Sequence, residues 1–174
     1  MSGTDSSSVP GRQTVARMSG RVIVAGPEDL VLLMRFVQDT GERADAFWLT
    51  PGGGVQPGET TAMAAARELA EETGILAGPG ELGPVVAESR GRWSDGEIIY
   101  DAQDVFFFLH VADLAVDISG QEDLERSLCT GHRWWRLGDL LASGEKIYPP
   151  GLPALAGLLL TGEQPSTPVQ MPWR

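Results

Sequence analysis

Short runs of hydrophobic residues recur along the chain, and they predict the strands of a sheet. Residues 14–25 (TVARMSGRVIVA) and 30–37 (LVLLMRFV) are β-branched and aliphatic, and the turn residues GPED separate them. This pattern predicts two strands joined by a hairpin turn. Similar runs predict further strands at 82–93, 104–112 and 132–137, and IIY at 98–100 could extend one of the first two.

The segment 61–73 has a different pattern, which predicts a helix. It lacks Gly and Pro and is rich in Ala, Glu, Arg and Leu, which are strong helix formers. Thr60 is placed to cap the start of this helix, and Gly74 is placed to end it. The apolar segments 137–144 and 151–160 are expected to form the closing helices. Because strands and helices alternate irregularly, the pattern favours an α/β fold with helices packed on a mixed sheet.

Polar segments set the expected limits of the domain. Residues 1–12 have the composition of a disordered N-terminal tail, and residues 161–174 are expected to be a C-terminal tail of the same kind. One domain over residues 13–160 is left between them, as the length of 174 residues suggests. Within it, residues 39–47 (DTGERADAF) are predicted to be a polar loop, and residues 122–131 could be a short helix or a loop.

Composition narrows the class of protein. Hydrophobic residues make up 42% of the chain, which is enough for a full core. No apolar run approaches the length that crosses a bilayer, and the serine-rich start lacks the apolar segment of a secretory signal. The single cysteine, Cys129, excludes an intrachain disulfide and fits a reducing cytoplasm. The net charge of −11, with Lys146 as the only lysine, argues against binding duplex nucleic acid through broad phosphate contacts.

Negative charge is crowded on one face of the predicted helix. Glu68, Glu71 and Glu72 fall within an arc of roughly 100°. Arg67 lies about 100° from Glu68, so it is not expected to neutralise all three carboxylates. A bound hard cation would relieve the repulsion, and oxygen ligands without His or Cys indicate Mg²⁺, Mn²⁺ or Ca²⁺ rather than zinc. A glycine turn and a glutamate pair are each common without any function, so the inference depends on their joint spacing.

That joint spacing resembles the Nudix box of the Nudix hydrolase superfamily, whose MutT-like members share one pattern. The pattern is Gly, five residues, Glu, seven residues, then Arg-Glu-aliphatic-any-Glu-Glu-any-Gly-aliphatic. The chain fills all nine specified places with Gly53, Glu59, Arg67, Glu68, Leu69, Glu71, Glu72, Gly74 and Ile75. The resemblance implies the family's α/β/α sandwich, with a mixed β-sheet, across about residues 14–160.

The resemblance also implies an activity. Family members hold Mg²⁺, for which Mn²⁺ can substitute, against a diphosphate while water attacks phosphorus in a nucleoside diphosphate linked to another group. The expected ligand is therefore a small nucleotide or nucleotide-sugar diphosphate. The chemistry agrees with the composition, because an acidic site repels a diphosphate unless metal ions screen the charge. Family members often pair, so a homodimer is expected by analogy.

By position in the box, four groups are expected to surround the metal. Glu68 and Glu72 would be metal ligands, one helical turn apart. Glu71 would share a metal or orient the attacking water. The backbone carbonyl of Gly52 or Gly53 would be a further ligand, because a glycine turn lets a carbonyl approach a metal. The general base is left open, so Glu68 and Glu71 are both catalytic candidates.

The resemblance assigns roles to three more charged residues. Glu59 and Arg67 are expected to pair and hold the loop against the helix, which makes them structural. Many family members add a further acid from a later loop, and we expect Glu125 to be that catalytic acid. The other candidates for this role are Asp101, Asp104 and Glu122.

Three residues near a predicted strand end are candidates for contact with the substrate. Arg90 and Arg92 could bind phosphate through their planar guanidinium groups, and Trp93 could stack on a base. The competing interpretation is a surface pair of arginines beside a ring at the edge of the core.

Two other functions are compatible with the scaffold. Isopentenyl-diphosphate isomerases share it but use a catalytic cysteine, whereas Cys129 lies far downstream of the box and in no matching motif. Non-hydrolytic Nudix-fold regulators that bind nucleotides usually lose box carboxylates, and none is lost here. Metal-dependent phosphate release separates a hydrolase from both. The sequence does not assign the substrate.

Overall fold

The computed structural model describes residues 13–39, 44–94, 97–120 and 128–173. Its strands form one mixed sheet in the order β3-β2-β1-β6-β5-β8, with β4 paired to β1 and β7 paired to β2. The strands are β1 (Gln13–Gly26), β2 (Leu30–Asp39), β3 (Ala44–Leu49), β4 (Gly52–Gly54), β5 (Ala87–Ser94), β6 (Ile98–His110), β7 (Cys129–Arg136) and β8 (Val169–Met171). The predicted hairpin is confirmed, and IIY, which was predicted to extend one of two strands, belongs to β6.

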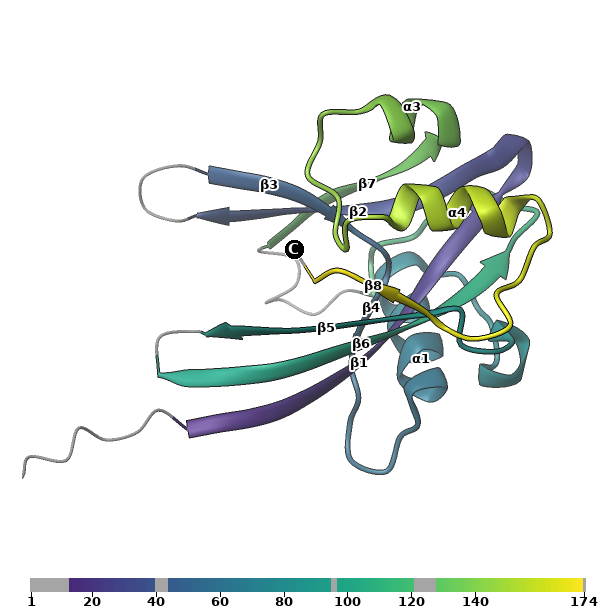
Figure 1. Cartoon of the computed structure of the whole chain (residues 1–174). Coiled ribbons are helices and arrows are strands. Elements are labelled where there is room, and N and C mark those ends of the chain that lie inside the picture. The colour runs from purple at the N-terminus through teal and green to yellow at the C-terminus, as the bar shows by residue number, and fades with distance from the viewer. Residues whose placement is uncertain (1–12, 40–43, 95–96, 121–127, 174) are drawn as a thin grey trace, which may run out of the picture.

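The sheet divides into two arms because β1 and β2 pair over a short length only. Their register joins Val24–Gly26 to Leu30–Leu32. In contrast, β1 runs parallel to β6 from Gln13 to Ala25. Beyond the short pairing, β2 diverges with β3 and β7, while β1 continues with β6 and β5 (Figure 1).

Helices cover both faces of this sheet. Helix α1 (Thr61–Thr73) packs on one face, and α3 (Leu137–Ala142) and α4 (Leu152–Leu160) pack on the other. Successive side chains of a strand point to opposite faces. Val22 therefore joins the α1 side of the core, while Ile23 joins the α4 side. The α/β/α sandwich predicted from the sequence is confirmed.

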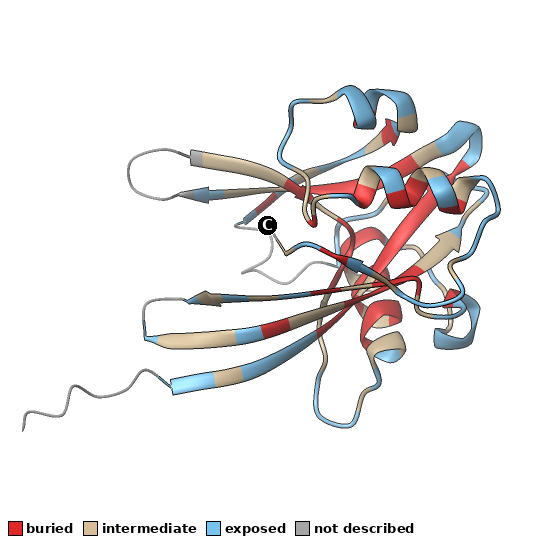
Figure 2. Cartoon of the chain, in the orientation of Figure 1, coloured by how far each residue is buried: buried red, intermediate tan, exposed pale blue. Residues whose placement is uncertain are grey.

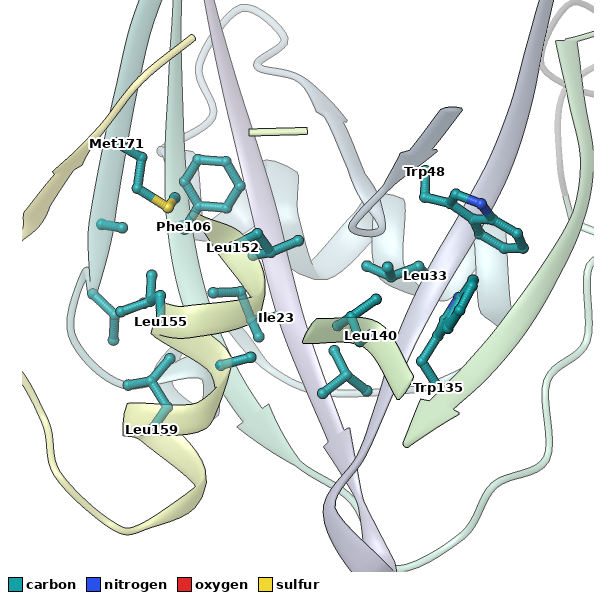
Figure 3. Close-up of a cluster of buried hydrophobic side chains, with 14 residues drawn as sticks. Ile23, Leu33, Trp48, Phe106, Trp135, Leu140, Leu152, Leu155, Leu159 and Met171 are labelled. Carbon is teal, nitrogen blue, oxygen red and sulfur yellow. The ribbon is translucent and has the colours of Figure 1, made fainter. Parts of the chain in front are cut away.

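The two hydrophobic clusters hold the layers together. On the α4 side, the buried side chains include Ile23, Phe106, Leu155 and Leu159 (Figure 3). Burial is concentrated where the helices meet the middle of the sheet, and the ends of the long strands are more exposed (Figure 2). Each fully buried large apolar side chain contributes roughly 1.5–3 kcal/mol. None of the helices in the described ranges combines the length and apolar character that crossing a membrane needs.

Helix α1 begins and ends where the sequence predicts. The Thr60 hydroxyl accepts a hydrogen bond from the Met63 N–H at 3.2 Å, which caps the start of the helix. At the other end, Gly74 has φ +70° and its N–H donates to the Ala70 carbonyl at 2.9 Å. Such left-handed ends favour glycine. The helix that carries the box carboxylates is thus fixed at both ends.

Two expectations about polar segments are wrong. Residues 161–174 are not simply a disorder-like tail, because β8 pairs in parallel with β5 and Met171 is buried in the core. The predicted loop 39–47 is partly strand, since β3 already begins at Ala44. In both cases strand pairing satisfies the backbone of a polar segment: β8 pairs with the distant β5, and β3 pairs with β2, the strand that precedes it.

Candidate active site

The glycine loop before α1 lies directly against the helix. Strand β4 pairs with β1, which brings Gly52 and Gly53 beside the carboxylates of α1. Gly52 has φ +136°, a conformation that residues with side chains rarely adopt, and its N–H donates to the Glu72 carboxylate at 2.8 Å. A Cβ atom at Gly53 would overlap the Glu68 carboxylate. Glycine is therefore required here for the backbone to approach the two acids.

The three carboxylates of α1 are not equally exposed. Glu68 and Glu72 are 6% and 4% exposed, whereas the Glu71 side chain is 38% exposed. Burial of a charged group is unfavourable unless it is paired or hydrogen-bonded. Glu68 and Glu72 therefore need compensation from nearby groups, and Glu71 can rely partly on water.

Arg67 supplies much of this compensation. Its Nε and Nη2 donate to the two oxygens of Glu59, at 2.8 Å and 3.0 Å. Its Nη1 donates to Glu68 at 2.8 Å and to Glu71 at 3.1 Å, and Nη2 also donates to the Gly54 carbonyl at 2.9 Å. The pairing of Glu59 with Arg67 implied by the resemblance is present. The angular argument that placed Arg67 away from Glu68 underestimated how far a long side chain can fold back along the helix.

These contacts keep the Glu59–Arg67 pair ionised. The hydrogen bonds from Arg67 and from the Gln56 N–H lower the pKa of Glu59 from 4.5 to about 2. The hydrogen bond to Glu59 is the main reason that the pKa of Arg67 lies above its ordinary value. The pair therefore stays charged throughout the neutral range and fastens the loop to the helix.

The donor groups suit a hard divalent cation. The buried carboxylates of Glu68 and Glu72 lie against the backbone of the glycine loop. The possible metal ligands are therefore carboxylate and backbone carbonyl oxygens, which Mg²⁺ prefers. Within the described residues, no three acidic, His or Cys side chains are already grouped around one point. The reason is visible in the contacts, since Glu68 and Glu71 turn to Arg67 and Glu72 turns to Gly52. The chemistry of the set fits a metal, and binding would require Glu68 to exchange its contact with Arg67.

A cavity of about 330 Å³ lies on the other side of β1 from these carboxylates. It is bounded by β3 on one arm of the sheet and by β1, β6 and β5 on the other. Its charged lining residues are Arg17, Arg21, Asp45 and Asp104, and its aromatic ones are Phe47, Trp93, Tyr148 and Trp173. A volume of this size accommodates a small ligand.

Arg21 connects the cavity with the glycine loop. Its Nε donates to Asp104 at 3.2 Å, and its Nη1 donates to the carbonyls of Thr50 at 3.1 Å and Gly52 at 3.2 Å. The Gly52 residue thus donates its N–H to Glu72 on the helix side and accepts from Arg21 on the cavity side. The cavity and the carboxylates of α1 therefore share one backbone residue as a boundary.

The structure brings only one of the three proposed substrate residues to this cavity. Trp93 lines it, stacked on Tyr100 at 4.1 Å between ring centroids. Arg90 and Arg92 are exposed and do not line it, because alternation along β5 puts them on the opposite face from Trp93. Arg92 instead approaches Asp101 at 3.5 Å.

The structure describes two of the four candidates for the later acid. Glu125, the favoured residue, and Glu122 lie outside the described residues. Of the other two, Asp101 is exposed, and Asp104 lines the cavity in contact with Arg21. The sequence reasoning missed Arg17 and Arg21. Their alternation with Ser19 along β1, which puts all three on one face, was the available signal.

Comparisons with known proteins identify the family of this chain. The chain matches the NUDIX domain over residues 17–155. It is 47% identical over 126 residues to the RNA pyrophosphohydrolase of Roseobacter denitrificans, covering 63% of this chain and 72% of that relative. The chain therefore belongs to the Nudix family, and it is a Nudix hydrolase, as the sequence predicts.

Solved structures of low sequence identity share the fold. The NUDIX domain of Shewanella oneidensis NrtR, complexed with ADP ribose, has a TM-score of 0.59 at 19% identity, covering 84% of this chain and 89% of that chain. The MutT protein from Methanosarcina mazei Go1 has a TM-score of 0.56 at 20% identity, with 86% and 96% covered. Likeness at this identity shows the fold alone, and the fold is the MutT-like one.

Proposed function

We propose that the chain is a Mg²⁺-dependent hydrolase that cleaves a diphosphate linkage in a nucleotide. The observation that carries this proposal is the placement of the buried Glu68 and Glu72 against Gly52 and Gly53, directly across Gly52 from a cavity of ligand size. Two buried acids beside a closely approaching backbone supply carboxylate and carbonyl oxygens, which are the ligands that Mg²⁺ prefers.

The chain's own groups then have distinct tasks. Glu68 and Glu72, with a carbonyl of Gly52 or Gly53, would hold Mg²⁺, and Mn²⁺ suits the same oxygens. A bound divalent ion would screen the diphosphate and lower the pKa of a water molecule. Glu71, the most exposed of the three acids, would hold or deprotonate that water. Arg67 keeps the loop and the helix together.

A later acid remains part of the proposal. Glu125 is the candidate from the sequence, and Asp104 is the alternative that lies at the cavity, where its contact with Arg21 gives it a structural task. Glu125→Gln should lower turnover without changing the melting temperature. If Asp104→Asn does this and Glu125→Gln is silent, the assignment of Glu125 fails.

For the substrate we favour a nucleotide with a 5′-terminal polyphosphate. The aromatic lining suits one base, and the relative from Roseobacter is named an RNA pyrophosphohydrolase. The net charge of −11 opposes contact with a long stretch of RNA, so only the terminal nucleotide would be held in the cavity. The prediction of no duplex binding is kept, as are the predictions of a cytoplasmic location and a homodimer.

The test is a hydrolysis screen with Mg²⁺ and with excess chelator. The panel contains 5′-triphosphorylated RNA oligonucleotides, nucleoside triphosphates, dinucleoside polyphosphates, ADP-ribose and a nucleotide sugar. We expect metal-dependent release of phosphate or pyrophosphate, fastest from the RNA 5′ end. Binding without hydrolysis across the panel would favour a nucleotide-binding regulator, and full turnover in chelator would refute the metal-dependent mechanism.

A further inference from the structure

The cavity is lined by two arginines and two aspartates, but only one of the arginines is paired with a described acid. Asp104 is paired with Arg21 at 3.2 Å, and Asp45 is paired with Lys146 at 2.7 Å. The remaining charged lining residue is Arg17, whose guanidinium has no hydrogen bond or ion pair to any residue in the described part of the chain. Arg17, which is exposed, is therefore the charged lining residue that no acid in the described part of the chain pairs with, in a protein whose net charge is −11.

Arg17 lies between Trp93, one of the aromatic lining residues, and the glycine loop. Its guanidinium carbon is 5.6 Å from the centroid of the Trp93 ring, a distance at which a cation is attracted to the face of an indole. Its Nη2 is 3.8 Å from the position that a Cβ atom would occupy at Gly54. A nucleotide whose base stacks on Trp93 would thus extend its 5′ phosphates past Arg17 toward the glycine loop and α1.

The other two arginines of this region are already occupied. Arg67 uses its donors on Glu59, Glu68, Glu71 and the Gly54 carbonyl. Arg21 donates to Asp104 and to two carbonyls, which makes it a positioning residue for the loop. Only Arg17 among the three offers a planar pair of free N–H donors, the arrangement that binds a phosphate through two hydrogen bonds.

We propose that Arg17 binds the phosphate attached directly to the nucleoside held in the cavity, so that the site recognises a nucleoside 5′-phosphate unit. This inference rests on the proposed function for the identity of the ligand. It does not depend on hydrolysis, because the contact forms on the cavity side of Gly52 and the carboxylates of α1 lie on the other side.

The test compares each of the four nucleosides with its 5′-monophosphate in the presence of excess chelator. A monophosphate is short, so it probes Arg17 without requiring a metal at the carboxylates. Binding is followed by calorimetry and by fluorescence of the cavity tryptophans, for the wild type, Arg17→Ala and Arg17→Lys. Arg136→Ala, which removes an exposed arginine paired to Glu28 outside the cavity, is the control for net charge.

For at least one base, the wild type should bind the monophosphate about tenfold or more tightly than the nucleoside. Arg17→Ala should abolish this preference while leaving nucleoside affinity unchanged, Arg17→Lys should keep part of it, and Arg136→Ala should keep all of it. If Arg17→Ala retains the preference, or the wild type shows none for any base, the proposal is wrong. If binding behaves as expected but no substrate is hydrolysed, the role of Arg17 stands and the proposed enzymatic function fails.

Discussion

The glycine loop with α1 and the cavity are adjacent, yet they are built in opposite ways. Every side chain of the first region comes from residues 52–75, and its arginine, Arg67, is fully engaged with acids and a carbonyl. The cavity is assembled from distant segments that include β1, β3, β5, β6 and the C-terminal segment, and within the described residues its Arg17 contacts the Trp93 ring but has no ion pair. The first region concentrates carboxylates, and the second contains an arginine, Arg17, that no described acid pairs with.

This difference suggests a division of work between the two regions. A metal ion would bind where acids are crowded, and an anionic part of the substrate would bind where a cation is unpaired. Gly52 lies between them, with its N–H directed to Glu72 and its carbonyl directed to Arg21. A nucleotide that spans this boundary would contact both regions at once.

The largest effect should come from the buried acids of α1. Glu72→Gln or Glu68→Gln should lower turnover by orders of magnitude, because each removes a charged oxygen ligand from the proposed metal site. Glu163→Gln, at an exposed acid far from the box in sequence, is the matched control and should be silent. Turnover is measured with the best substrate of the hydrolysis screen. Near-normal rates for both box variants would mean that these acids are only structural.

A smaller but still large effect is expected when Arg67 is removed. Arg67→Ala leaves Glu59, Glu68 and Glu71 without their shared partner, and loss of such partly buried charged hydrogen bonds should cost about 2–3 kcal/mol. For a domain of this size that corresponds to a melting temperature roughly 5–10 °C lower. Arg136→Ala removes the same charge at the surface and should shift it little. An unchanged melting temperature with lost activity would assign Arg67 to catalysis rather than structure.

The cavity should respond to substitution in substrate affinity more than in rate. Trp93→Ala should raise KM about tenfold, with a smaller change in kcat, because stacking on a base contributes roughly 1–3 kcal/mol. Arg90→Ala and Arg92→Ala, on the opposite face of β5, should stay within about twofold of the wild type. Steady-state kinetics on the same substrate decide the matter. A larger increase in KM for Arg92→Ala than for Trp93→Ala would show that the substrate binds on the exposed face of β5 and not in the cavity.

The smallest effect concerns acid stability. Arg67 lowers the pKa of Glu59 to about 2, so the pair contributes stability that is fully present above the ordinary value of 4.5 and is lost as the pH falls toward 2. The difference in melting temperature between the wild type and Glu59→Gln should therefore be constant near neutral pH and shrink from about pH 4.5 downward. Thermal melts between pH 7 and pH 2 measure it. A difference independent of pH would show that the charge of Glu59 is not what stabilises the loop.

The two regions also differ in how far the sequence predicts them. The loop and helix were predictable because their chemistry is local: caps, glycines and carboxylates recur at fixed spacing, as Thr60 and Gly74 illustrate. The cavity was not, because it depends on which distant strands pair. Trp173 reaches the cavity only because the segment before it pairs with β5, and Arg17 does so because β1 lies beside β6.

Even where contacts are local, spacing alone misjudged the electrostatics. The helical angle between Arg67 and Glu68 suggested that Arg67 would not neutralise all three carboxylates, but its flexible side chain reaches Glu68, Glu71 and the Gly54 carbonyl. The acids are consequently better compensated without metal than the sequence implied. The proposed metal must therefore compete with Arg67 for Glu68, whereas Glu72 accepts a hydrogen bond from the Gly52 N–H.

The central claim is that the acids of α1 form a metal site, and the response of the melting temperature to Mg²⁺ tests it most directly. A metal that binds only the folded state adds about 2.7 kcal/mol at a hundredfold excess over its dissociation constant, which is several degrees for a domain of this size. The wild type and Glu163→Gln should show this rise as Mg²⁺ is titrated, and Glu72→Gln should show little or none. If Glu72→Gln keeps the full shift, the acidic face of α1 is not where the metal binds, and the account is wrong.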